Sequence, residues 1–236
     1  MTKRIDVSAQ AKLWEYYQNR DPDSFRWAHP RLDFLTREIE RDLGRQQATI
    51  MTVGAGDGYL EQRLQDLGHR VVCIDLDPDS VASLASRGIE AIQADLATFA
   101  WAGAPVDLVV ASEVLEHLDP EVASTCVTNM VAPLRLGGRL LVTVPCRENL
   151  ARSQICCPHC GEVFHRYGHL QCFDADSIQK LVSQAGVEIE RCEERFFPNY
   201  AGLNLGGKLT SFAKHLAWRV AGRHTPGLRY FVSAVK

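Results

Sequence analysis

The sequence predicts an α/β fold with one seven-stranded, mostly parallel sheet and helices on both of its faces. Short apolar segments alternate with segments whose apolar residues recur at helical spacing, and glycine or proline stands between most of them. This alternation is typical of parallel strands joined by right-handed helical crossovers. The predicted strands are residues 48–54, 70–75, 89–94, 106–111, 138–144, 187–194 and 228–235.

Helices are predicted between the strands and at the N-terminal side of the sheet. Pro30 in the first turn and Gly44 after the last turn mark the second of two N-terminal helices. Gly186 ends the helix that precedes the sixth strand. The predicted helices are residues 8–20, 30–43, 58–67, 78–87, 120–132, 176–185 and 207–222.

Composition is that of an ordinary globular protein. The chain has 236 residues, of which 46% are hydrophobic and 23% charged, so a single domain can bury a full core. The formal net charge of −3 gives no general attraction to nucleic acid or to anionic membranes, although Lys208 to Arg229 leaves room for a local basic patch. Without an apolar leader or an apolar run of eighteen residues, we expect a cytoplasmic protein with no membrane partner.

The most informative motif is the glycine-rich turn Gly54-Ala55-Gly56-Asp57-Gly58, which follows an apolar strand and precedes a helix. Glycine at these positions permits positive φ and lets backbone N–H groups approach a ligand. Asp75 ends the next strand, 21 residues after Gly54, where a ribose-binding carboxylate is expected. Dinucleotide-binding turns usually have glycine where this chain has Tyr59, so the predicted ligand is nucleotide-like but not a dinucleotide.

Four motifs in this order resemble the class I S-adenosylmethionine-dependent methyltransferases of the small-molecule type, over roughly residues 48–190. They are Gly54-x-Gly56-x-Gly58, Asp75, Ala94-Asp95-Leu96 and Ser112-Glu113-Val114-Leu115-Glu116-His117. The resemblance implies a Rossmann-like fold, S-adenosylmethionine as cofactor and methyl transfer as activity. It also implies that the N-terminal helices cover the cofactor, so that Trp14, Tyr16 and Tyr17 are either lid contacts or core anchors.

By this resemblance, the glycine turn lies along the methionine part of the cofactor, Asp75 accepts the ribose hydroxyls, and Asp95 with Leu96 meets the adenine. The family usually has Asp or Glu two residues before the first glycine, where this chain has Thr52, which weakens the expected contact with the cofactor's ammonium. The implied cofactor-binding residues are Gly54, Ala55, Gly56, Asp57, Gly58, Asp75, Leu76, Asp95, Leu96, Ser112 and Glu113.

The segment after the fifth strand distinguishes this chain, because four of its eight cysteines lie between Cys156 and Cys172. A Cys-x-x-Cys-Gly pattern followed by two histidines has the form of a zinc knuckle with one tetrahedral Zn²⁺. The pair could instead be redox-active, but the usual placement at a helix start is absent. We therefore predict a structural Zn²⁺ with Cys156 and Cys172 in reserve. The predicted ligands are Cys157, Cys160, His165 and His169.

Two histidines are candidates for catalysis. His117, with an ordinary pKa near 6.5, is a candidate general base or a packing residue at a helix start. His169 is either a zinc ligand or a substrate-site histidine, because it leads into a helix much as such a residue does in many related methyltransferases. A similar Glu-x-x-Glu-His with a later histidine binds a divalent ion in small-RNA 2′-O-methyltransferases. The corresponding residues are Glu113, Glu116, His117 and His169.

The predicted organisation is one domain, 1–236, in four parts. These are N-terminal helices (1–45), a cofactor-binding core (46–145), the knuckle-like insertion (146–173) and the C-terminal half of the sheet (174–236). The predicted function is methyl transfer to a hydroxyl or amine of a small molecule or glycan. The alternatives are a metal-dependent RNA 2′-O-methyltransferase and a non-catalytic zinc-containing binding module. The sequence does not indicate the oligomeric state.

Overall fold

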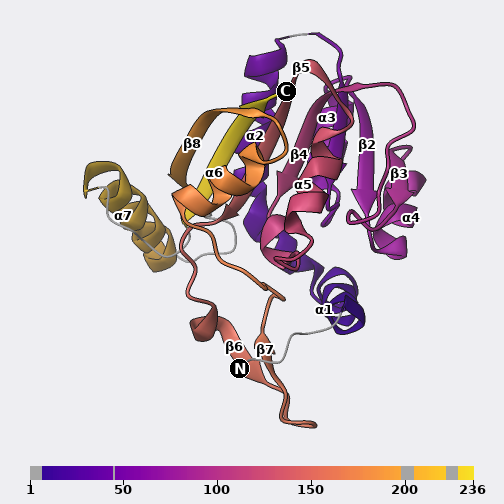
Figure 1. The fold of residues 1–236 in the computed structure, drawn as a ribbon. Helices are drawn as coiled ribbons and strands as arrows, with labels where there is room; N and C mark the ends of the chain where they lie inside the picture. The colour runs from indigo at the N-terminus through magenta and orange to yellow at the C-terminus, as the bar shows by residue number, and fades with distance from the viewer. Residues whose placement is uncertain (1–6, 45, 198–204, 222–227) are drawn as a thin grey trace.

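The structure, a computed structural model, describes residues 7–44, 46–197, 205–221 and 228–236. Its main sheet has seven strands in the order β3-β2-β1-β4-β5-β9-β8 (Figure 1). Neighbours among β1 to β5 pair in parallel, whereas β9 runs antiparallel to both β5 and β8. The predicted seven-stranded, mostly parallel sheet is confirmed. The strands are β1 (Thr49–Val53), β2 (Arg70–Asp75), β3 (Glu90–Gln93), β4 (Val106–Ser112), β5 (Leu134–Pro145), β8 (Glu188–Phe196) and β9 (Leu228–Val235).

Helices cover both faces of the sheet and two apolar cores form between the layers. Adjacent β1 residues point to opposite faces, so Ile50 joins one core and Met51 the other. The first core is filled from α2 and α3, and the second from α5 and α6. Burial on both faces explains why these strands are continuous apolar runs. The helices are α1 (Val7–Arg20), α2 (His29–Leu43), α3 (Tyr59–Asp66), α4 (Pro78–Ser86), α5 (Ala123–Val131), α6 (Ala175–Ser183) and α7 (Leu205–Ala221).

Most predicted boundaries lie within two residues of those in the structure, and the two that differ by more do so for local reasons. Helix α5 begins at Ala123 instead of 120, because the Asp119 carboxylate accepts the Glu121 N–H at 2.9 Å and forms a turn there. Strand β5 begins at Leu134 instead of 138, because Leu134 pairs with Val106 ahead of a register shift. No described helix is long and apolar enough to cross a membrane.

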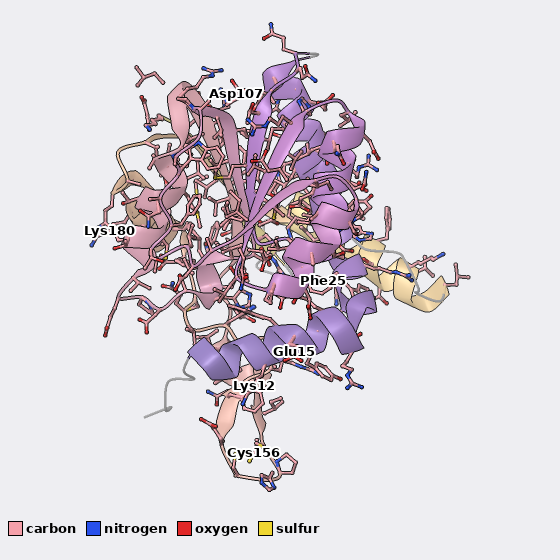
Figure 2. All side chains as sticks on the ribbon, turned by 90° about the vertical axis from the view of Figure 1, so that its right-hand side faces the viewer. Lys12, Glu15, Phe25, Asp107, Cys156 and Lys180 are labelled. Atoms are coloured by element: carbon pink, nitrogen blue, oxygen red, sulfur yellow. The ribbon has the colours of Figure 1, made fainter. Side chains whose placement is uncertain are left out.

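The insertion forms a two-stranded antiparallel hairpin of β6 (Gln154–Cys156) and β7 (Val163–His165). It follows the short 3₁₀ helix η3 (Leu150–Ser153). Figure 2 shows the hairpin projecting beyond α1, with Cys156 near its outer end. The base of the hairpin, and not its tip, therefore lies toward the body of the protein.

Candidate active site

A cavity of about 840 Å³ lies at the carboxyl ends of β1, β2 and β4, where open α/β sheets bind ligands. Residues of the glycine turn, the ends of these strands, α1 and the start of α2 line it. All but one of the predicted cofactor-binding residues lie in its wall. They are Gly54, Ala55, Gly56, Asp57, Asp75, Leu76, Asp95, Leu96, Ser112 and Glu113.

The exception is Gly58, which is not part of the cavity wall and caps the start of α3 in the left-handed conformation, with φ 72°. A Cβ here would meet the Arg87 guanidinium at 2.0 Å. The two glycines before it, Gly54 and Gly56, line the cavity. Gly54 has φ 79°, and a Cβ on it would lie 3.0 Å from Val114, while Gly56 has φ 52° and faces the Phe25 ring. The turn therefore requires glycine both for its backbone angles and for space.

Asp75 links the glycine turn to the end of β2. Its carboxylate accepts the Ala55 N–H at 2.6 Å and the Asp77 N–H at 2.8 Å. Burial raises the pKa of Asp75, in spite of these two hydrogen bonds. A carboxylate has about four lone-pair positions, so two remain for a ligand's hydroxyl groups. The site thus fits the ribose of a nucleotide-type cofactor.

The N-terminal helices close the cavity from outside the sheet. Trp14, Tyr16 and Tyr17 all line it, which favours the lid interpretation of these aromatic residues over the core-anchor one. Trp14 packs edge-on against His117 with ring centroids 5.6 Å apart. The Tyr17 hydroxyl donates a hydrogen bond to the Arg166 carbonyl at 2.9 Å, so α1 is tied to the loop after β7.

Sequence reasoning missed the residues that cover the glycine turn. His29, at the start of α2, stacks on Tyr59 with ring centroids 3.8 Å apart and hydrogen-bonds Asp57 at 2.8 Å. Phe25 packs against Gly56. Nothing in the local pattern around Phe25 or His29 indicates these contacts, since they depend on how α2 is placed on α3.

Glu113 lies in the cavity wall between two arginines. Arg229 donates a hydrogen bond to its carboxylate, and Arg31 lies 3.9 Å from the same oxygen. Burial acts to raise the pKa of Glu113, but Arg229 and Arg31 outweigh it and lower that pKa. The residue has φ 59°, a left-handed conformation that is unusual for a non-glycine residue. Its carboxylate is engaged by arginines, so its contact with the cofactor stays a prediction.

His117 and His169 meet at the side of the cavity, with ring centroids 4.8 Å apart. His117 Nδ1 lies 3.3 Å from the Gly168 carbonyl, which can only accept, so Nδ1 is the protonated nitrogen in this contact. His169 Nδ1 lies 2.5 Å from the Glu148 carboxylate. Burial, followed by the proximity of His169, lowers the pKa of His117 to about 3. The predicted ordinary pKa near 6.5 is therefore wrong for His117.

Glu116 completes this group of side chains. It is buried, and neither of its carboxylate oxygens has a hydrogen-bond partner. Burial and the neighbouring Glu113 raise its pKa well above the usual range. Ligand atoms of Glu116, His117 and His169 lie within 4.8 Å of one another, a spacing that could hold a metal ion. Glu113, the fourth ligand of the metal-dependent alternative, is not part of this group.

A second group consists of Glu148, His165 and His169. Glu148 accepts from His169 and lies 3.5 Å from His165 Nε2, whose ring is buried. Burial acts to raise the pKa of Glu148, but the two histidines outweigh it and lower that pKa to about 2. His165 Nδ1 accepts the His169 N–H at 3.1 Å, which leaves the proton of a neutral ring on Nε2, facing Glu148. Sequence reasoning missed Glu148, which has no motif around it.

The structure does not bring the four predicted zinc ligands together. Cys157 pairs with Glu162 at the turn of the hairpin, since its N–H donates to the Glu162 carbonyl at 2.8 Å. His165 is three residues further along β7, which at about 3.3 Å per residue places it roughly 10 Å away. No group of three ligand atoms found among the described residues contains a cysteine. His165 thus lies at the base of the hairpin, paired with Gln154, whereas Cys157 follows the other end of β6.

The segment after the hairpin is fastened to the turn that carries His117. Leu170 donates its N–H to the Glu116 carbonyl at 2.8 Å. The Gln171 side-chain amide donates to the carbonyls of Leu115 and Leu118 at 2.9 and 3.0 Å. These bonds hold the backbone beside His169 against the 3₁₀ helix η2 (Leu115–His117).

Comparison with known proteins agrees with this geometry. Residues 50–138 match the family described as a methyltransferase domain. A probable S-adenosylmethionine-dependent methyltransferase of Mycobacterium tuberculosis is 29% identical over 146 residues, which cover 61% of this chain and 50% of that protein. The chain therefore matches about half the length of this curated relative.

Solved structures share the fold over nearly the whole chain. The 1,6-didemethyltoxoflavin-N1-methyltransferase of Burkholderia thailandensis, with bound 1,6-didemethyltoxoflavin and S-adenosylhomocysteine, has a TM-score of 0.67 at 18% identity and covers 100% of this chain and 93% of its own. The N-methyltransferase NodS of Bradyrhizobium japonicum, in complex with S-adenosylhomocysteine, has a TM-score of 0.60 at 18% identity, with 95% and 96% covered. Identities this low show the fold alone.

The chain thus has the fold of the S-adenosylmethionine-dependent methyltransferases of known structure, and its residues 50–138 match the methyltransferase-domain family. Within this chain the domain's family match begins in β1 and ends in β5, so it contains the glycine turn, Asp75 and Asp95. The N-terminal helices, the hairpin and the last two strands lie outside that match.

Proposed function

We propose that this chain transfers a methyl group from S-adenosylmethionine to a hydroxyl or amine of a small molecule or glycan. One observation carries the proposal: the glycine turn and Asp75 open into the same cavity as His117 and His169. Its volume of about 840 Å³ is in the range of small-molecule sites. The first solved methyltransferase named above supports a small-molecule acceptor, because it has bound 1,6-didemethyltoxoflavin, and the second supports an amine, because it is an N-methyltransferase.

S-adenosylmethionine, when bound, supplies a methyl group on a positively charged sulfur. Transfer is an in-line displacement in which the acceptor's lone pair forms the new bond to the methyl carbon and the C–S bond breaks. The chain must align the acceptor and take up its proton. His169 suits that task, because Glu148 holds its Nδ1–H and leaves Nε2 to accept. His117 is the weaker base, since its pKa of about 3 disfavours proton uptake.

A second candidate is metal-assisted methylation of a hydroxyl, and the group of Glu116, His117 and His169 favours it. Histidines that bind a metal usually donate their other ring N–H to a carbonyl or carboxylate, as His117 and His169 do here. Glu116 adds a buried carboxylate whose oxygens lack a hydrogen-bond partner. Such a donor set suits a divalent ion that polarises a hydroxyl. This observation concerns the metal and does not favour RNA as the acceptor.

Calorimetric titration with S-adenosylhomocysteine tests the cofactor assignment. We expect micromolar binding to the wild type and a loss on the order of 100-fold in Asp75→Ala, because two charge-assisted hydrogen bonds to the ribose disappear. Circular dichroism of the variant checks that it is folded. Absence of binding to the wild type would contradict the proposal and favour a non-catalytic binding module.

A further inference from the structure

The wall of the cavity contains a buried carboxylate that no sequence motif indicates. Glu61, in the first turn of α3, is 1% exposed, and its Oε2 atom has no hydrogen-bond partner. It lies beside Thr52 and lines the same cavity as the glycine turn. A buried charge is costly unless something compensates it, so a buried carboxylate at a ligand cavity with one oxygen unpartnered points to a cationic ligand group.

The order of the strands indicates which part of the cofactor would reach Glu61. Asp95 follows β3, Asp75 ends β2 and Thr52 belongs to β1, and these strands are neighbours in the order β3-β2-β1. A nucleotide whose ribose is held at Asp75, with its base beyond it toward β3, must place its remaining part over β1. In S-adenosylmethionine that remaining part is the amino-acid end, which carries an ammonium group.

We propose that Glu61 binds the ammonium of S-adenosylmethionine and thereby supplies the acidic group that Thr52 does not. This inference rests on the proposed function and deepens it. The position of Glu61 suits the task. Its carboxylate comes from α3, yet it lies against Thr52, the β1 residue at the position where the resembled family usually has an acidic side chain. The site assigned to Glu61 takes a primary ammonium group attached to a nucleoside thioether or sulfonium.

The electrostatic surroundings of Glu61 agree with this role. Burial raises the pKa of Glu61 to about 7, and the negative charges of Asp57 and Asp75 add to the effect. Cys73 on β2 also lies close, and burial together with Glu61 raises its pKa, so it is a neutral thiol there. The Arg87 guanidinium, at the end of α4, donates to the carbonyls of Gly58 and Asp57 at 3.4 and 3.3 Å. Before the ligand binds, Glu61 thus faces the carboxylates of Asp57 and Asp75, which repel its negative charge. An incoming ammonium relieves this repulsion.

Two ligands separate the ammonium contact from the rest of the cofactor site. S-adenosylhomocysteine carries the amino-acid end, whereas 5′-methylthioadenosine has the same nucleoside thioether without it. We expect Glu61→Gln to weaken S-adenosylhomocysteine binding 10- to 100-fold at pH 8 and to leave 5′-methylthioadenosine binding within about twofold. Asp75→Ala should weaken both ligands. Asp79→Asn, which removes one exposed negative charge outside the cavity, should change neither.

The pH dependence gives an independent readout. An ionised Glu61 is needed to attract the ammonium, so wild-type affinity for S-adenosylhomocysteine should rise about tenfold from pH 6 to pH 8, through the pKa of about 7. The Glu61→Gln variant should lack this rise, and so should 5′-methylthioadenosine with the wild type. If Glu61→Gln does not fold, Glu61→Asp, which withdraws the charge by one methylene, should show the same ligand selectivity.

The outcomes are distinct. Equal affinities of wild type and Glu61→Gln for S-adenosylhomocysteine would overturn the inference, and so would an equal loss for both ligands, which would mean that Glu61 only shapes the turn. If the wild type binds neither ligand, the proposed function itself fails.

Discussion

Replacing His169 by alanine is expected to lower the rate of methyl transfer by on the order of 10²–10⁴-fold and to leave the affinity for S-adenosylhomocysteine within about twofold. His169 lines the cavity next to His117, it is not among the predicted cofactor-binding residues, and its Nδ1 is held by Glu148. Its loss removes either a general base or a metal ligand, and both act on the acceptor. The measurement is kcat with an acceptor found by screening, together with calorimetry of cofactor binding.

Two further variants distinguish these roles of His169. Glu148→Gln keeps the shape of the side chain that holds His169 but removes its charge. If His169 is a base, this variant should lower kcat less than His169→Ala does, and it should shift the pH dependence of kcat. Glu116→Gln should abolish a requirement for Mn²⁺ or Mg²⁺ if the metal-assisted reaction holds. A large loss of S-adenosylhomocysteine affinity in His169→Ala would instead place this residue in the cofactor site.

Replacing Arg229 by methionine is expected to lower the free energy of unfolding by about 3–5 kcal/mol, because it leaves the Glu113 carboxylate buried with a weaker partner. Arg31, 3.9 Å away, retains part of the compensation, which favours the lower end of this range. Urea-induced unfolding measures the change. Arg135→Met is the matched control, since it breaks an exposed ion pair with Asp107 and should cost less than about 1 kcal/mol.

The effect of Arg229→Met should depend on pH in a defined direction. The folded-state pKa of Glu113 lies below its ordinary value of 4.5. Its contribution to stability is therefore fully present above pH 4.5 and is lost as the pH falls through the lower, folded-state value. The difference between wild type and variant should shrink in acid. A difference that stayed constant from pH 7 down to acid pH would show that the loss comes from packing and not from charge.

The sheet and the cofactor turn could be predicted from the sequence because their causes are local. Apolar runs bounded by glycine and proline fix strands, and the Gly54 and Gly56 positions require glycine for reasons that a short segment already contains. The carboxylate of Asp75 was also found by its spacing from Gly54, since strand length and crossover length determine where it falls.

The residues that escaped prediction owe their roles to long-range placement. Glu61 looks like an ordinary helix residue, and only the packing of α3 on β1 reveals that its carboxylate is buried in the cavity wall. Glu148 meets His169 because a hairpin returns the chain across 21 residues. The zinc site stays a prediction. Its four ligands are close in sequence, but among the described residues the groups that could hold a metal ion contain His165 and His169 without a cysteine.

The bonds from Leu170 and Gln171 to the 115–118 turn have a consequence for how this chain can diversify. They set the separation of His117 and His169 at the point where the hairpin rejoins the body, whatever the hairpin contains beyond its base. We therefore expect the turn at 157–162 to tolerate insertions, deletions or loss of its cysteines without a change in that separation. Changes in the outer hairpin can therefore accumulate without changing the arrangement of the two histidines.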